Sequence, residues 1–370
     1  MKGETFASEW TEFRDQATGV RVHRMTAHPS INHATYFLQS SFSPDGQALL
    51  FVSYRDGGRA GLHEIWPFPD GPIRQLTEGE GLHPFSPAYH PDGGSIFFVR
   101  GGGIWRLERR SLAESCIVHF EGAQLGECSV GGGGEWLTAA IKQGSQSGIV
   151  TGKADGTDWR TIPFPRTVIH PQFHPLDPEW IEFAGDPAPR IHRVRRDGTG
   201  LECMYDHSNG EFVVHETFLG NTGDLVYTVW PRALWRMDWR TRERSPIAEF
   251  NAWHITPNRA GTLVLCDTNH PDEGIFLIDT ATGFRKRVCL SLATNQGSQW
   301  KTSRYALGED FAAARSAAKT GGTLSWMEVA TDTVYGPQWT HPHPSFSNDE
   351  TKVVFTSDRT GHPQVYVAEL

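Results

Sequence analysis

Residues 338–346 (QWTHPHPSF) carry the side chains of this chain that are best suited to chemistry. His341 and His343 are spaced i, i+2, and in an extended strand this spacing directs both side chains to one face. Pro342 between them has no N–H group, so we expect the segment to be an edge or innermost strand of a sheet. Gln338 adds an amide oxygen close by. Two imidazoles and an amide oxygen form most of a divalent metal site.

Three more histidines stand at comparable places along the chain. His170 (HPQF), His215 (HETF) and His254 (HIT) each come just before or at the start of an apolar stretch. A neutral imidazole can bind a metal ion or accept a proton near neutral pH. Each also has a structural interpretation, because a histidine at the start of a strand can simply hydrogen-bond to a neighbouring strand. Taken alone, the pattern leaves both interpretations open.

The composition limits the classes of protein to consider. The 370 residues carry a formal net charge of -9, with a pI near 6.0, which argues against a nucleic-acid-binding surface. The five cysteines show no C-x-x-C spacing, so we expect free, buried thiols. The first ten residues (MKGETFASEW) lack a signal-peptide pattern, and no run of about 18 apolar residues appears. We therefore expect a cytoplasmic protein with no nucleic-acid or membrane partner.

The chain repeats a unit of about forty residues, which is the period of four-stranded propeller blades. Its clearest copies are residues 41–46 (SFSPDG), 89–93 (YHPDG) and 345–349 (SFSND), each followed by an apolar strand. Weaker copies start near residues 129, 172, 217, 255 and 307. The sequence therefore predicts an all-β fold, a single β-propeller domain over residues 1–370 with seven or eight four-stranded blades. Residues 20–25 (VRVHRM) are expected to supply the outer strand of the last blade and close the ring.

The last thirty-five residues also carry a family resemblance. The pattern Q-x-x-H-P-H-P-S-F, followed by V-F-T-S-D and P-x-x-Y, resembles the last blade of the oligogalacturonate lyases, a β-propeller family of polysaccharide lyases. Residues 13–19 (FRDQATG) and 75–79 (QLTEG) are similar to its opening strands and first blade. Residues 215–218 (HETF) are similar to the segment that carries its catalytic base.

The resemblance implies a role for each candidate residue. The implied ligands of a divalent ion, manganese in the family, are His254, Gln338, His341 and His343. His215 matches the general base, and Arg190 matches a substrate-binding arginine of the catalytic site. His170 is implied as a substrate contact. Arg190 also lies in an arginine-rich stretch, which is ordinarily a solvated strand face.

The chain departs from the family pattern at three places. Residues 184–187 (AGDP) replace an H-x-E-G-P-like segment, Ala34 stands where an arginine is expected, and residues 295–300 (NQGSQW) lack a histidine. These departures affect the substrate pocket more than the metal site. The uronate, its linkage, exolytic or endolytic action, the native metal and the oligomeric state stay open.

The implied reaction suits these residue types. The implied function is metal-dependent β-elimination from a 4-linked uronate, which gives a 4,5-unsaturated product. A divalent ion on the C6 carboxylate stabilises the charge that develops when the C5 proton leaves. Three imidazoles and an amide leave the charge of the ion undiminished, and a histidine base such as His215 is unprotonated near neutrality. The partner expected is thus an oligosaccharide that contains uronic acid.

Other function classes fit the chain less well. The main alternative is a non-catalytic, TolB-like propeller that binds other proteins, which does not require converging histidines. A glycosidase needs two opposed carboxylates, and the predicted blade entrances show no such pair. A propeller peptidase needs a G-x-S-x-G motif in a second domain, which the sequence lacks.

Overall fold

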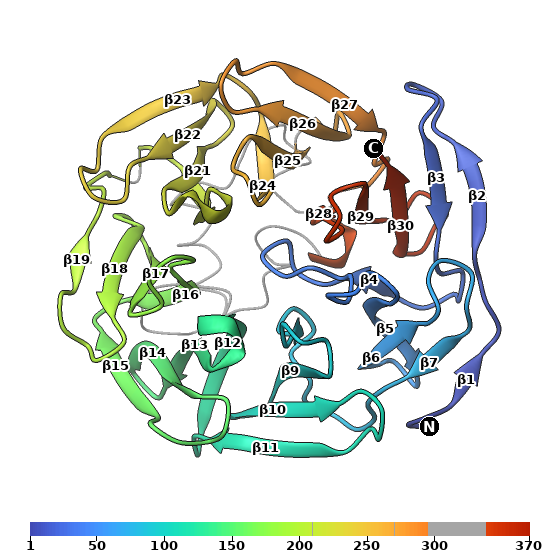
Figure 1. The fold of residues 1–370 in the computed structure, drawn as a ribbon, viewed down its shortest axis with the longest axis horizontal. Helices are drawn as coiled ribbons and strands as arrows, with labels where there is room; N and C mark the ends of the chain where they lie inside the picture. The colour runs from blue at the N-terminus through green and yellow to red at the C-terminus, as the bar shows by residue number, and fades with distance from the viewer. Residues whose placement is uncertain (209, 270, 295–337) are drawn as a thin grey trace, which may run out of the picture.

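Seven antiparallel sheets form a ring in the computed structural model, which describes residues 1–208, 210–269, 271–294 and 338–370. Figure 1 looks down the axis of this ring, with the first strand of each sheet near the centre and the last at the rim. Each sheet is one blade of a β-propeller, so the predicted all-β propeller fold is confirmed, and the ring has seven blades. The eighth candidate unit, near residue 307, lies outside the described residues.

The blades follow one another along the chain. In order from the axis outwards, blade one consists of β4 (Asn32–Ala34), β5 (Leu49–Asp56), β6 (Arg59–Ile65), β7 (Ile73–Gln75) and β1 (Thr5–Phe6), and blade two of β8 (Ala88–Tyr89), β9 (Ser95–Arg100), β10 (Gly103–Glu108) and β11 (Glu114–His119). Blade three consists of β12 (Ala123–Gly131), β13 (Trp136–Gln143), β14 (Gln146–Lys153) and β15 (Arg160–Phe164), and blade four of β16 (Thr167–Phe173), β17 (Trp180–Asp186), β18 (Ile191–Arg195) and β19 (Glu202–Cys203). Blade five consists of β20 (Val213–Phe218), β21 (Leu225–Val229), β22 (Ala233–Met237) and β23 (Arg244–Ala248), and blade six of β24 (Ala252–Pro257), β25 (Leu263–Thr268), β26 (Ile275–Asp279) and β27 (Arg285–Cys289). Blade seven consists of β28 (Ser345–Phe346), β29 (Lys352–Ser357), β30 (Gln364–Glu369), β3 (Arg21–Arg24) and β2 (Thr11–Arg14).

The repeated polar turns are built by the same side-chain contacts in different blades. In blade one the Ser43 hydroxyl donates to Asp45 Oδ1 at 2.5 Å and accepts from the Ala48 N–H at 2.9 Å. In blade seven Ser347 donates to Asp349 at 2.6 Å and accepts from the Lys352 N–H at 3.0 Å. The S-x-D pattern therefore fixes the turn between the first and second strands, because its side chains satisfy the backbone locally.

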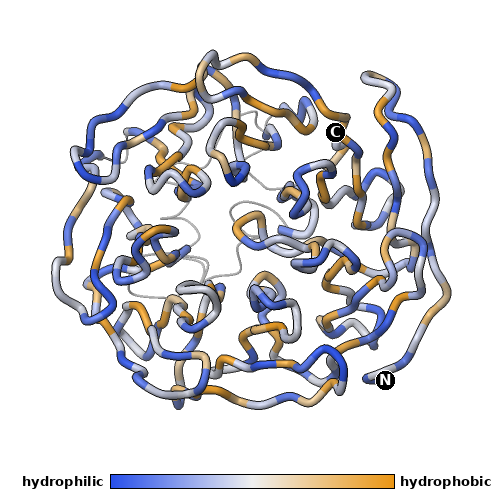
Figure 2. The backbone as a smooth tube through the Cα atoms, in the orientation of Figure 1, coloured by the Kyte–Doolittle hydropathy of each residue, from blue (hydrophilic) through white to orange (hydrophobic). Residues whose placement is uncertain are grey.

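The hydrophobic core is divided among the seven contacts between adjacent blades. Each contact holds an apolar cluster with side chains from both blades, such as the one that joins Phe51 of blade one to Val354 of blade seven. The middle strands are buried on both faces, whereas outer strands such as β11 and β23 are largely accessible. Figure 2 shows this division as apolar segments through the blades and hydrophilic loops around them.

The N-terminal segment closes the ring, as the sequence predicts. Strand β3 pairs with β30 at the outer edge of blade seven, with Val22 opposite Ala368, and β2 pairs with β3. The same segment reaches blade one, where β1 pairs with β7. Closure by hydrogen-bonded strands leaves no unpaired edge between the first and last blades.

Helical structure in the described residues is limited to three short 3-10 turns, η1 (Gly132–Gly134), η2 (Gly220–Thr222) and η5 (Gln338–Thr340). None of the helices in this part of the chain is long and apolar enough to cross a membrane. All five cysteines are free thiols, and the expectation that they are buried is wrong for Cys116, which is exposed, and for Cys203, which is only partly buried.

Candidate active site

Breaks in the innermost strands place the candidate residues at the mouth of the central channel. In blades three to six the pairing register shifts by one residue within the first strand, where residues 126–127, 170–171, 215–216 and 253–254 form bulges. His170 and His215 stand in these bulges with positive φ angles of 55° and 59°. A bulge turns a side chain away from the sheet, and positive φ in a residue other than glycine is typical of functional positions. The bulges therefore direct imidazoles toward the axis.

Three of the predicted metal ligands converge in blades six and seven. One nitrogen each of His254, His341 and His343 can be chosen so that all three lie within 4.8 Å of one another. All three side chains are buried, and the His254 and His343 rings are 4.0 Å apart. Burial, followed by the neighbouring imidazoles, lowers the pKa of His254 and of His343 well below its usual value. Neutral imidazoles at this spacing are suited to hold one divalent ion.

The local structure that brings these histidines together differs from the predicted strand. Gln338 belongs to η5, the strand β28 begins only at Ser345, and His341 and His343 lie between them. His343 has a φ of 45°, so the alternation of an extended strand does not apply there. The prediction that they share a strand face is wrong, although they do meet at one place.

Asp267 on β25 contacts two of the three clustered histidines, and the sequence analysis did not predict it. These three residues, His254, His341 and His343, are called the triad below. Its carboxylate accepts from the His254 backbone N–H and contacts His254 Nδ1, both at 2.7 Å. It also accepts a hydrogen bond from the His343 backbone, and burial raises its pKa to about 8. A carboxyl group in contact with Nδ1 fixes the ring orientation of His254 and leaves its Nε2 available to bind an ion. In the sequence, Asp267 is only the penultimate residue of an apolar strand, which gives no such signal.

His215 lies beside the triad on β20. Its ring is 4.6 Å from that of His254 and packs edge-on against Trp253 at 4.4 Å. Burial, followed by the neighbouring His254 and His170 and by Arg190, lowers the pKa of His215 well below its usual value. Its Nδ1 has no hydrogen-bond partner among the described residues. The imidazole is therefore neutral and can accept a proton.

Arg190 reaches the same cavity but is bound to a carboxylate. Its guanidinium meets Glu216, the residue after His215, through Nε at 2.8 Å and Nη2 at 3.2 Å, and Nη1 lies 3.5 Å from Asp186. Burial raises the pKa of Glu216, but the charge and hydrogen bonds of Arg190 outweigh it and hold the pKa below its usual value. Two donors of Arg190 thus serve to neutralise a buried carboxylate, so that a ligand would meet only the outer part of the guanidinium.

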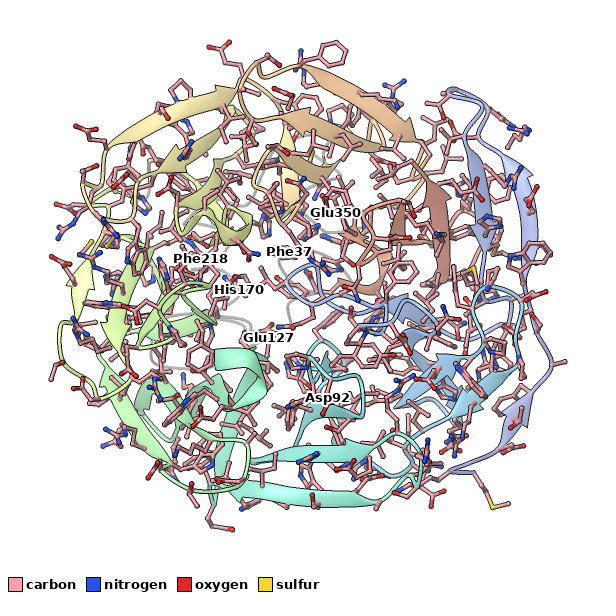
Figure 3. All side chains as sticks on the ribbon, in the orientation of Figure 1. Phe37, Asp92, Glu127, His170, Phe218 and Glu350 are labelled. Carbon is pink, nitrogen blue, oxygen red and sulfur yellow. The ribbon has the colours of Figure 1, made fainter. Side chains whose placement is uncertain are left out.

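His170 and the loop after β4 complete the floor of the site. His170 Nε2 lies 2.9 Å from the Tyr36 hydroxyl. The buried Phe37 ring packs against His215 and His254, each at 5.3 Å between ring centres. Figure 3 shows Phe37 and His170 close to the axis of the ring. The sequence gives no reason to place Phe37 beneath the histidines, because its loop belongs to the opposite side of the ring.

A cavity of about 120 Å³ joins these residues into one site. The cavity is lined by Tyr36, His83, Phe85, Glu127, Ile169, His170, Arg190, Val214, His215, Trp253, His254 and Gln338. Five of the seven predicted site residues line it, namely His170, Arg190, His215, His254 and Gln338. The other two, His341 and His343, lie against His254. Glu127 and His83 are members that the sequence did not predict.

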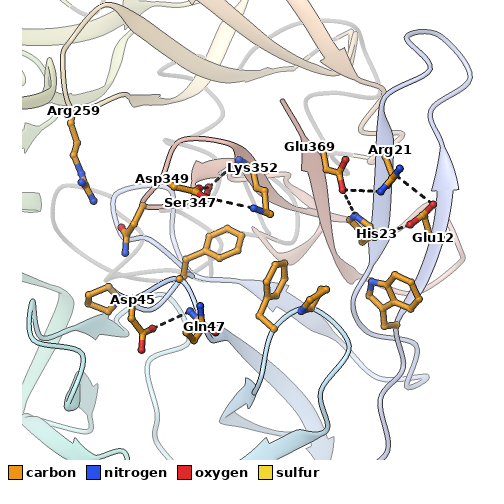
Figure 4. A pocket seen from close by; sticks show the side chains of 17 residues that line it. Glu12, Arg21, His23, Asp45, Gln47, Arg259, Ser347, Asp349, Lys352 and Glu369 are labelled. Atoms are coloured by element: carbon orange, nitrogen blue, oxygen red, sulfur yellow. Dashed lines mark hydrogen bonds and ion pairs between the residues drawn. The ribbon is translucent and has the colours of Figure 1, made fainter.

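A larger hollow of about 720 Å³ lies beside the turns of blades one and seven and the N-terminal strands (Figure 4). Its charged side chains form pairs, such as His23 with Glu369 at 3.0 Å and Arg21 with Glu12 at 3.6 Å. Among the described residues no group of three metal-ligating side chains occurs there. The concentration of neutral imidazoles therefore makes the smaller cavity the candidate active site.

Three comparisons show which known proteins this chain resembles. The family model described as "Oligogalacturonate lyase" matches residues 1–163. The oligogalacturonate lyase of Dickeya dadantii (strain 3937) is 26% identical, and the alignment covers 100% of this chain and 98% of that protein. An oligogalacturonide lyase of Pectobacterium atrosepticum is 25% identical with the same coverage.

Solved structures show the same fold over the whole chain. An oligogalacturonate lyase in complex with manganese superposes with a TM-score of 0.82 at 21% identity, covering 100% of this chain and 98% of that one. The oligogalacturonate lyase of Vibrio parahaemolyticus superposes with a TM-score of 0.80 at 20% identity. By the family model over residues 1–163, by relatives aligned over its full length and by the shared propeller fold, this chain is similar to the oligogalacturonate lyases.

Proposed function

We propose that this protein cleaves 4-linked oligogalacturonate by metal-dependent β-elimination and releases a 4,5-unsaturated uronate. The observation that carries the proposal is the cluster of His254, His341 and His343 beside the neutral His215, with His215 and His254 lining one cavity. The relatives named as oligogalacturonate lyases supply the substrate class. A purely binding propeller of the TolB-like kind does not need buried, uncharged imidazoles arranged in this way.

The residues fit a divalent ion, and we propose manganese because one similar structure is described as a manganese complex. His254, His341 and His343 would hold it, with the amide of Gln338, which lines the same cavity, as a fourth ligand. His343 Nε2 is buried without a hydrogen-bond partner among the described residues, as expected of a ligand atom. When bound, the ion supplies Lewis-acid stabilisation of the negative charge on the substrate C6 carboxylate.

The other residues act on the sugar itself. His215 accepts the C5 proton, since burial keeps its imidazole neutral. Arg190 lends positive charge to the cavity and, with the outer part of its guanidinium, orients a substrate carboxylate. His170, held by Tyr36, contacts the sugar from the next blade. The Phe37 floor excludes water from the channel beneath.

The test is an assay of the metal-stripped protein on digalacturonate and trigalacturonate, with and without added Mn²⁺, followed by the ultraviolet absorbance of the unsaturated product. We expect activity only with the metal, and a loss of about 10²–10⁴-fold in kcat for His215→Ala. His215→Ala should still bind Mn²⁺, because His215 is not a member of the triad.

Two results would contradict the proposal in different ways. Metal binding without product from any uronate oligosaccharide would mean that the site is real but the substrate class is wrong. Neither metal binding nor product would mean that the histidines are structural, and the binding-propeller alternative would then be preferred.

A further inference from the structure

The third blade places a carboxyl group where the other blades place histidines. In the described residues, the inner strands or the segments just before them carry His33, His83, His170, His215, His254 and the pair His341 and His343 in six blades. The third blade carries Glu127, which stands in the bulge of β12 just as His254 stands in the bulge of β24. The same kind of bulge therefore directs Glu127 to the cavity that His170 also lines, and Figure 3 shows Glu127 near the axis of the ring.

Glu127 is buried in the cavity without the partners that a structural carboxylate needs. Only 6% of the residue is accessible, and Oε2 has no hydrogen-bond partner among the described residues. No salt bridge joins it to a cation in that part of the chain, in contrast to Glu216, which Arg190 neutralises. Burial raises the pKa of Glu127 to about 7. A carboxyl group of this kind holds its proton near neutrality and can donate it.

The stereochemistry of the proposed substrate requires a second proton-transfer group. In a 4-linked galacturonate, the C5–H and C4–O4 bonds lie on opposite faces of the sugar ring. A base that removes the C5 proton from one face cannot reach O4 on the other face. His215 from blade five and Glu127 from blade three line one cavity, with blade four between them. Two groups on separate walls match an elimination of this geometry.

We propose that Glu127 is the catalytic acid that protonates O4 of the leaving sugar, while His215 removes the C5 proton. This inference rests on the proposed function. The C5–H bond breaks and its proton goes to His215, while its electron pair forms the C4–C5 double bond. The C4–O4 bond breaks, and O4 takes the proton of Glu127 and leaves as a hydroxyl group. The site ends with a protonated His215 and an ionised Glu127, and one proton passed between them through water restores it.

The other ionisable groups that face the cavity are less suited to this role. They are Tyr36, His83, His170, Arg190, His215 and His254. Burial lowers the pKa of His83 and of His170 to about 4, so these imidazoles carry no acidic proton near neutrality. Arg190 faces Glu216 and holds its protons too tightly. Tyr36, whose hydroxyl contacts His170, is the one competing acid.

The experiment varies the leaving group. Digalacturonate is compared with a methyl galacturonide that carries 4-nitrophenoxide at C4, because nitrophenolate leaves without a proton. With Mn²⁺ present, we expect Glu127→Gln to lower kcat/KM on digalacturonate about 10²–10⁴-fold, and on the aryl substrate by less than about 10-fold. His215→Ala should lose activity on both substrates. Manganese binding by Glu127→Gln should be unchanged, which separates the effect from damage to the site.

Two variants control the comparison. Glu182→Gln removes another buried carboxyl group that does not line the cavity, so any effect should fall equally on both substrates. Tyr36→Phe tests the competing acid. The inference is overturned if Glu127→Gln affects both substrates equally or neither, or if Tyr36→Phe gives the leaving-group pattern instead. If the wild-type protein with Mn²⁺ cleaves neither substrate, the proposed function has failed, and the role of Glu127 fails with it.

Discussion

At the scale of single residues, the site depends on side chains whose charge is controlled by burial. The imidazoles of the cavity are neutral because burial disfavours their protonated forms, and this is the state that binds a metal or accepts a proton. The carboxyl groups divide into two kinds. Glu216 is held ionised by Arg190, whereas Glu127 has no cation and keeps its proton near neutrality.

Asp267 should set the affinity of the metal site, because it fixes the orientation and ligand atom of His254. We expect Asp267→Asn to weaken Mn²⁺ binding about 10–100-fold, as measured by calorimetric titration. Asp45→Asn makes the same chemical change in a turn far from the histidines and should leave the affinity unaltered. Equal affinities for both variants would show that Asp267 does not orient the ligand.

Glu127 should make the stability of the metal-free protein depend on pH. Its pKa is raised from 4.5 to about 7, so below pH 4.5 both folded and unfolded states are protonated. Between pH 4.5 and 7 only the folded state keeps the proton, and stability falls as the pH rises. Between pH 4.5 and 7 the free energy of unfolding of the wild-type protein should therefore fall by up to about 3 kcal/mol relative to that of Glu127→Gln. Above pH 7 the difference should not change further. Urea unfolding at several pH values measures the difference, and a constant difference would contradict the assignment.

At the scale of elements, bulges and one long loop place the site. A regular inner strand would turn alternate side chains into the sheet, whereas the two-residue bulges at His215 and His254 free them for the cavity. The loop after β4 then brings Phe37 across the ring to support these rings from below. It is held there because the Thr256 hydroxyl donates to the carbonyl groups of Phe37 and Pro344.

Removal of the Phe37 ring should loosen the site as well as the fold. We expect Phe37→Ala to lower the free energy of unfolding by about 3–5 kcal/mol, because it leaves a cavity under four imidazoles. It should also weaken Mn²⁺ binding, since the His254 and His343 rings lose their support. Phe37→Leu keeps most of the volume and should have a smaller effect on both. Unchanged metal affinity in Phe37→Ala would show that the floor does not position the ligands.

At the scale of the whole molecule, the site is completed only by the closed ring. The proposed metal ligands come from blades six and seven, the proposed base from blade five, Glu127 from blade three and the floor from blade one. The apolar clusters between adjacent blades hold these positions in place, and β3 joins the two ends of the blade series. Opening the ring should therefore affect every part of the site at once.

Deletion of residues 1–25 tests this dependence. It removes β1, β2 and β3 and exposes the edge of β30, together with the apolar cluster around Val22. We expect a lower Tm and association through the open edge, measured by thermal unfolding and sedimentation. Deletion of residues 1–8 removes only β1 and should keep the ring closed. A monomer with an unchanged Tm after the longer deletion would show that strand closure is not needed.

The amino-acid sequence by itself determined the blades and named most of the residues of the candidate site. Repeated S-x-D turns and apolar strands are local signals, because their hydrogen bonds and burial depend on neighbouring residues, and they predicted the propeller and its closing strand. The histidines at the starts of the units were visible in the same way.

Only the tertiary structure decided how these residues meet. The turn of His343 away from a strand, the pairing of Arg190 with Glu216, and the places of Asp267, Phe37 and Glu127 depend on contacts between distant segments and on burial. A sequence pattern records neither the contacts between distant segments nor the burial of a side chain, because both arise only when the ring closes.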